Sequence, residues 1–140
     1  MTSLKPSNPK DSVGIKKFYY SVIPWNVIGE LGIALLEGAL KYGRHNYRGV
    51  GVKASVYYDA TLRHLTTWWE GEDVDPDSDL SHITKAIASL TVLRDSMLRN
   101  NWEDDRPPRV DPEWTKELNK KAAQLIEKYP NPVKAWTNEP

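Results

Sequence analysis

The run GELGIALLEGALKYG, residues 29–43, constrains the fold more than any other stretch of this chain. Its apolar residues recur at helical spacing, so the sequence predicts a helix over residues 24–42 that Gly43 terminates. Only Glu30, Glu37 and Lys41 carry charge in this run, and they share one stripe of the helix. A helix that is apolar on nearly every other side is expected at the centre of a fold.

Three further segments carry helical patterns of apolar residues. They run over residues 55–69, from Asp79 or Ser81 to Arg99, and over residues 111–129. Ser55 is expected to cap the first of them, and the last begins with Asp111 as N-cap and Pro112 at the first helical position. Because no β-rich segment competes, the sequence predicts an all-α bundle of about four helices.

Proline-rich segments flank this predicted bundle. Residues 1–22 are expected to form an extended arm, and the chain ends in a proline-rich tail. We predict a main helical domain over residues 1–100. Residues 101–140 are predicted to supply a linker, a helix and the tail, which pack on the core or on a neighbouring subunit.

Composition excludes several classes of partner and site. Charged residues make up 27% of the 140 residues and balance to a net charge of zero, so no basic field would hold nucleic acid or an anionic membrane. The absence of cysteine excludes disulfides and thiolate metal sites. The polar N-terminal sequence resembles no signal peptide. We therefore expect a soluble cytoplasmic protein that binds neither nucleic acid nor membrane.

The two carboxylates of the apolar helix need an explanation. An ionised carboxylate in such surroundings must be paired, protonated or bound to a metal. One reading is structural, with Glu37 paired to Lys41 at i, i+4 and Glu30 paired to an arginine of another helix. The other reading is a metal site, and residues elsewhere in the chain favour it.

An acidic turn, GEDVDPDSD, occupies residues 71–79. Glu72, Asp73 and Asp75 lie between two predicted helices, and His82 opens the second. Oxygen ligands at this density, with one or two imidazoles, suit Mg²⁺ or Mn²⁺. A solvated loop remains the alternative, and it is the favoured reading for Asp77 and Asp79.

The basic residues complete a pattern that suits phosphoryl chemistry. Metals would neutralise polyphosphate oxygens, and Lys41, Arg63 and Lys17 could take the remaining charge. No GxxxxGK[ST] loop is present, which excludes a Walker-type cradle. His64, beside Trp68, also fits a hydrogen-bonded core histidine.

Four segments together resemble a known family. They are NPKDSVGIKK, IPWNVIGELGIALLEGALKYGRHNYRG, ATLRHLTTWWEGEDVDPDS and LSHITKAIASL. In this order they resemble the phage and bacterial dATP/dGTP diphosphohydrolases, which are related to the MazG-type all-α nucleotide pyrophosphohydrolases. The resemblance runs from about Asn8 to Leu98 and implies a MazG-like catalytic domain within residues 1–100.

The resemblance implies a helical homodimer or homotetramer that hydrolyses a deoxynucleoside triphosphate to the monophosphate and pyrophosphate. Two or three Mg²⁺ or Mn²⁺ ions would be held by acidic residues. Phage members are associated with remodelling of the purine pool, which would place such a protein in the host cytoplasm. The usual E-x-x-E and E-x-x-D motifs are not intact. Ile33 occupies the second glutamate position of the motif that starts at Glu30, and Asp79 and His82 occupy the two acidic positions of the later motif.

These considerations yield three sets of predicted site residues. The metal ligands are Glu30, Glu37, Glu72, Asp75, Asp79 and His82. The catalytic residues are Glu30, Glu37, Lys41 and Arg63. The substrate-binding residues are Lys17, Tyr42, Asn46, Tyr47, His64 and Trp68, with the aromatic rings as stacking surfaces and Asn46 as a reader of the base edge.

Two alternative functions stay open at this point. The same histidines and aspartates could serve a metal-dependent phosphohydrolase that acts on another phosphorylated small molecule. A non-catalytic helical binding module would treat the acidic turn as plain surface.

Overall fold

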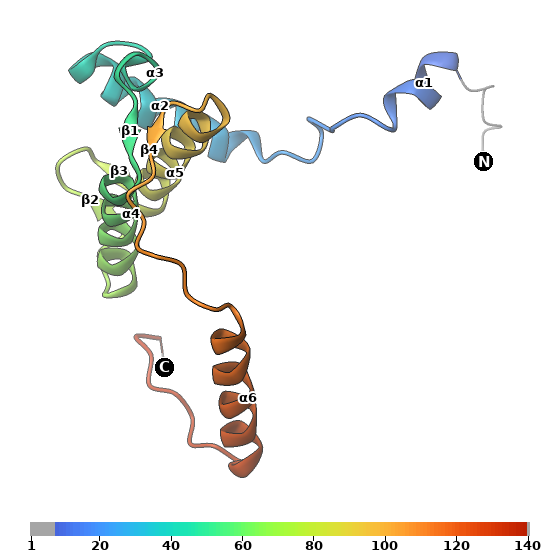
Figure 1. Ribbon diagram of the computed structural model, residues 1–140, viewed down its shortest axis with the longest axis vertical. Helices are drawn as coiled ribbons and strands as arrows, with labels where there is room; N and C mark the ends of the chain where they lie inside the picture. Colours follow the sequence, from blue (N-terminus) through green and yellow to red (C-terminus); the bar gives the residue numbers. More distant parts are fainter. Residues whose placement is uncertain (1–7, 140) are drawn as a thin grey trace. The chain divides into compact units, whose positions relative to one another are not determined.

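The computed structural model describes residues 8–139, which form helices and four two-residue strands (Figure 1). In chain order these elements are α1 (Pro9–Gly14), α2 (Trp25–Tyr42), α3 (Asn46–Val50), β1 (Val52–Lys53), α4 (Ala54–Trp69), β2 (Val74–Asp75), β3 (Leu80–Ser81), α5 (His82–Leu98), β4 (Trp102–Glu103) and α6 (Glu113–Lys128). The predicted all-α class is confirmed. The chain divides into two compact units, Met1–Arg106 and Pro107–Pro140.

The four long helices α2, α4, α5 and α6 lie close to the predicted bounds, whereas α1 and α3 were not predicted. The prediction of an extended arm is wrong for Pro9–Gly14, which forms α1. Asn8 and Asp11 form a capping box there, and Pro9 takes the first helical position. The first seven residues of the predicted arm lie outside the described part of the chain.

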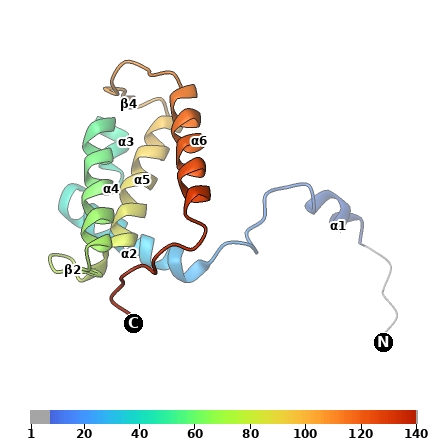
Figure 2. The ribbon, with the colours of Figure 1, turned by 90° about the horizontal axis from the view of Figure 1, so that it is seen from below.

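Helices α4 and α5 pack side by side and form the centre of the unit Met1–Arg106 (Figures 1 and 2). Their buried side chains are small, which allows the two helix backbones to approach closely. These residues are Ala54 and Thr61 on α4, with Thr84, Ala86, Val92 and Ser96 on α5. His82 is also buried, although it is polar.

Helix α2 is not central within this chain, so that prediction is wrong. It packs on α5 and buries only Ala34, while Ile33 is 54% exposed and Leu40 is 80% exposed. The apolar pattern of α2 indicated burial correctly for one stripe only, because among the described residues of the unit Met1–Arg106 only α5 packs extensively against it.

A strand pair ties the beginning of α4 to the segment after α5. β1 pairs in parallel with β4, and Asp105 follows β4. The Asp105 carboxylate accepts hydrogen bonds from the backbone N–H of Ser55, at 2.8 Å, and from its hydroxyl. The prediction that Ser55 caps α4 is therefore wrong, because the capping acceptor comes from Asp105, fifty positions along the chain. These hydrogen bonds lower the pKa of Asp105.

The acidic turn forms a tight hairpin in which β2 and β3 pair antiparallel. Asp75 organises it, since its carboxylate accepts from the N–H of Asp77 at 3.0 Å and its carbonyl from the N–H of Asp79 at 2.8 Å. Ser81 then caps α5 by accepting from the N–H of Ile83 at 3.1 Å. The hairpin therefore delivers His82 as the first residue of α5.

In the unit Pro107–Pro140, α6 begins one residue after Pro112, where the carboxylate of Asp111 accepts from the N–H of Glu113 at 2.9 Å. Helix α6 is amphipathic, and within this unit its Trp114 and Leu125 are exposed. Every helix within residues 8–139 is too short or too polar to span a lipid bilayer.

Candidate functional site

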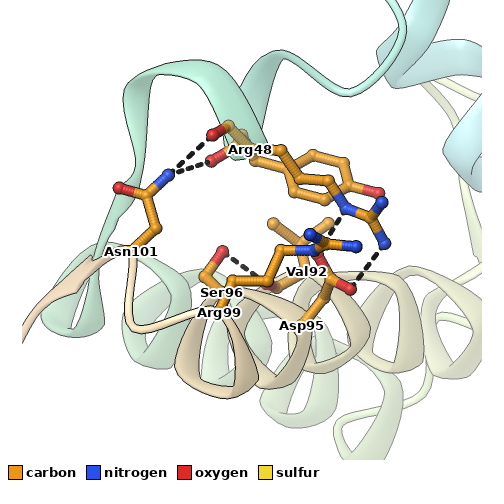
Figure 3. Close-up of polar contacts among 7 residues, drawn as sticks. Arg48, Val92, Asp95, Ser96, Arg99 and Asn101 are labelled. Atoms are coloured by element: carbon orange, nitrogen blue, oxygen red, sulfur yellow. Dashed lines mark hydrogen bonds and ion pairs between the residues drawn. The ribbon is translucent and has the colours of Figure 1, made fainter.

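The short helix α3 is held on α5 by a polar clamp (Figure 3). Arg48 forms a bidentate ion pair with Asp95, with nitrogen–oxygen distances of 2.9 and 2.8 Å. The side chain of Asn101 donates to the backbone carbonyl of Arg48 at 2.8 Å. The ion pair lowers the pKa of Asp95 and raises that of Arg48. The clamp therefore fixes the loop from Gly43 to Gly51 against the bundle.

This loop closes one side of a cavity of about 420 Å³, a volume within the range of small-molecule sites. The cavity also contacts α2, α4 and α5. Its polar and aromatic lining comprises Tyr42, Arg44, His45, Asn46, Tyr47, Tyr57, Lys85 and Ser89. Three predicted substrate-binding residues, Tyr42, Asn46 and Tyr47, thus meet at one cavity. Burial raises the pKa of Tyr57, which keeps this phenol neutral.

Glu37 lies beside two lysines. Its carboxylate is 2.7 Å from the Lys85 ammonium and 3.5 Å from that of Lys41. The Lys85 hydrogen bond is the main cause of a lowered pKa of Glu37. The i, i+4 pair of the structural reading is therefore present, with a closer partner that sequence reasoning missed. A signal existed, because Lys85 is the only charged residue between His82 and Arg94.

A second polar group joins α4, α5 and the acidic hairpin. His64 Nδ1 lies 2.9 Å from His82 Nδ1, and His82 Nε2 lies 2.8 Å from a carboxylate oxygen of Glu72. Because the Glu72 carboxylate can only accept, His82 Nε2–H donates to it. His82 Nδ1 is then an acceptor for His64 Nδ1–H. Burial is the main cause of a lowered pKa of His64, and the charge of Lys85 acts in the same direction.

His64, Asp75 and His82 could together hold a divalent ion. Each offers one ligand atom, and these atoms lie within 4.8 Å of one another. Two neutral imidazoles and a carboxylate fit Mn²⁺ more closely than Mg²⁺, which prefers oxygen ligands. Glu72 supports this assignment, since metal-binding histidines usually donate their other ring N–H to a carboxylate. We refer to His64, Asp75 and His82 as the histidine cluster.

The structure does not bring every predicted residue to this region. Glu30 is exposed on α2, and its side chain makes no hydrogen bond or ion pair within residues 8–139. Asp79 is exposed at the hairpin tip, where its φ is 58°. Lys17, Arg63 and Trp68 are also exposed. Their roles stay predictions, as do the metal-binding roles of Glu30, Glu37 and Asp79. His64, predicted to bind substrate, lies in the histidine cluster with two of the predicted ligands.

A known protein family matches the first unit of the chain. Residues 7–106 match the family described as dATP/dGTP diphosphohydrolase, N-terminal. This match covers the unit that carries the cavity and the histidine cluster and ends at the boundary between the two units. Neither the curated proteins nor the solved structures contain a match to the chain. Because the family match spans more than half of the sequence, the chain belongs to the dATP/dGTP diphosphohydrolase family.

Proposed function

We propose that this protein hydrolyses dATP and dGTP to the monophosphate and pyrophosphate with the help of Mn²⁺ or Mg²⁺. The observation that carries the proposal is the arrangement along α5. His82 belongs to the histidine cluster, and Lys85 and Ser89 line the cavity. These three residues occupy positions i, i+3 and i+7 of α5, so they share one face of the helix. This face extends over about 10 Å, because each helical residue rises about 1.5 Å. An extended nucleotide could therefore reach both features.

The histidine cluster supplies the ligands for the ion in this proposal. A divalent ion there would neutralise phosphate oxygens and make water a stronger nucleophile near neutral pH. Glu72 holds the ring of His82 in place through Nε2, so that Nδ1 faces His64 Nδ1. An ion bound by both nitrogens would replace the proton that they share, which is released to solvent. Glu30, Glu37 and Asp79 are the proposed sources of ligands for any second or third ion.

The cavity is the proposed nucleoside site. Tyr42, Tyr47 and Tyr57 supply aromatic surface against which a purine can stack. The carboxamide of Asn46 has both donors and an acceptor, and among the described residues it has no hydrogen-bond partner. It is therefore free to pair with either the amino group of adenine or the carbonyl oxygen of guanine.

We further propose that the protein is a homodimer or homotetramer, with a second copy covering α2. Trp25, Ile33, Leu36 and Leu40 of α2 are all between 43% and 80% exposed within the unit Met1–Arg106. An apolar surface of this kind is typical of subunit interfaces. Light scattering coupled to size-exclusion chromatography should give a mass of two or four chains, and Leu36→Asp should shift it towards one. A monomeric wild type would contradict the proposal.

Product analysis tests the reaction. The protein is incubated with Mn²⁺ or Mg²⁺ and, separately, with each deoxynucleoside and ribonucleoside triphosphate, and the products are separated by chromatography. We expect dAMP and dGMP, each with an equal amount of pyrophosphate. Orthophosphate with a nucleoside diphosphate would refute the proposal, and turnover of all bases at equal rates would refute its purine preference.

The role of Glu30 can be separated from that of the histidine cluster. If Glu30 holds an ion, Glu30→Gln should abolish turnover while circular dichroism remains unchanged. Full activity of this variant would remove Glu30 from the site, and the histidine cluster would then have to provide the ligands without it.

A further inference from the structure

Lys85 occupies the junction between the two parts of the site. It follows His82 by one turn of α5 and lines the cavity, and its side chain is only 18% exposed. A lysine that is this well covered needs an anionic partner, because its charge has lost much of its hydration. In the unliganded chain that partner is Glu37, at 2.7 Å.

Glu37 has a second lysine, Lys41, at 3.5 Å, and this changes the charge balance of the junction. One carboxylate faces two ammonium groups, so the three side chains carry a net charge of +1. Arg44, which also lines the cavity, adds a further cation. A local excess of positive charge beside a cavity favours an anionic ligand.

We propose that Lys85 binds the phosphate chain of the nucleotide and releases Glu37 when the nucleotide enters. Glu37 keeps its ion pair with Lys41 when Lys85 turns to the phosphates. The exchange therefore does not leave the Glu37 carboxylate unpaired. The exchange places the phosphates beside His82 and the nucleoside towards Ser89. The identity of the ligand as a nucleotide rests on the proposed function, whereas the affinity of Lys85 for polyphosphate does not.

Calorimetric titration with inorganic tripolyphosphate, without divalent ions, tests this assignment on the full chain. Lys85→Met should bind tripolyphosphate about 10- to 100-fold more weakly, the usual effect of losing a hydrogen bond to a charged group. Lys85→Arg should restore most of the affinity. Lys53→Met is the matched control, because Lys53 is a half-exposed lysine that pairs with Glu103 away from the cavity, and it should bind like the wild type.

Glu37→Gln gives a second test that does not depend on losing a lysine. It removes the competitor of the phosphate chain, so we expect several-fold tighter binding of tripolyphosphate. Binding of 2′-deoxyadenosine, which has no phosphate, should change much less in these variants than binding of tripolyphosphate. Circular dichroism establishes that each variant is folded.

Several results would overturn the assignment. They are a wild type that does not bind tripolyphosphate, a Lys85→Met variant that binds it as the wild type does, and a Glu37→Gln variant that binds it more weakly. Failure of the proposed function looks different, since binding would depend on Lys85 while no pyrophosphate is released from dATP or dGTP.

Discussion

Replacing Gly51 with alanine tests how firmly the loop that closes the cavity is held. Gly51 has φ 77° and ψ 177°, a region that is essentially restricted to glycine and costs other residues about 1–3 kcal/mol. A Cβ here would lie 2.9 Å from the side-chain oxygen of Asn101 and 3.2 Å from its backbone oxygen. Moving the Asn101 side chain away breaks its hydrogen bond to Arg48, which is worth about 1 kcal/mol. We therefore expect Gly51→Ala to lower the free energy of unfolding by about 2–4 kcal/mol.

Two other glycines separate the backbone cost from the clash. Gly43 also has a positive φ, 92°, but no atom lies near a Cβ built on it, so Gly43→Ala should cost only about 1–3 kcal/mol. Gly49 lies in α3 in open space without a positive φ, and alanine there should be neutral or stabilising by up to about 1 kcal/mol. Urea unfolding followed by circular dichroism measures all three. Equal losses for Gly51→Ala and Gly49→Ala would contradict the assigned cost of the Gly51 backbone conformation and of the contact with Asn101.

Three further predictions concern Asp95, Asp105 and Trp136. Asp105→Ala should lower the urea midpoint because α4 loses the acceptor for Ser55, and Asp105→Asn, which keeps an acceptor, should lose less. Arg48 lowers the pKa of Asp95, so its stabilisation is present above about pH 4 and disappears as the pH falls through the folded-state value. Between about pH 5 and about pH 2, the free energy of unfolding should therefore fall more steeply for the wild type than for Asp95→Asn. Parallel curves of unfolding free energy against pH would contradict this. Trp136 is 97% exposed within the unit Pro107–Pro140, so Trp136→Ala should change the unfolding free energy of that unit by less than about 0.5 kcal/mol.

The helices were predictable because the signals that form them are local. The signals are the spacing of apolar residues within α2, α4, α5 and α6 and the proline directly before α6. Each of them depends only on residues that are close together in the sequence. Spacing along a helix does not reveal what covers it, which is why α2 was predicted to be central. The cap of α4 was assigned to Ser55 because the true acceptor, Asp105, comes from a distant segment.

The sequence indicated which residues belong to the candidate site better than it indicated which of them lie together in space. Tyr42, Asn46 and Tyr47 are close in sequence and share one cavity. The sequence predicts different roles for His64 and His82, because only the packing of α4 on α5 brings their Nδ1 atoms within 2.9 Å of each other. Lys85 was missed because its partner Glu37 is on another helix.

The most direct test of the account is the rate of pyrophosphate release from dGTP in the presence of Mn²⁺ by His82→Ala. His82 is the residue that links Glu72, His64 and the face of α5. We expect this variant to keep its helical circular dichroism and to lose turnover by at least about 100-fold relative to the wild type. A folded His82→Ala protein that releases pyrophosphate at the wild-type rate would contradict the assignment of the histidine cluster to catalysis.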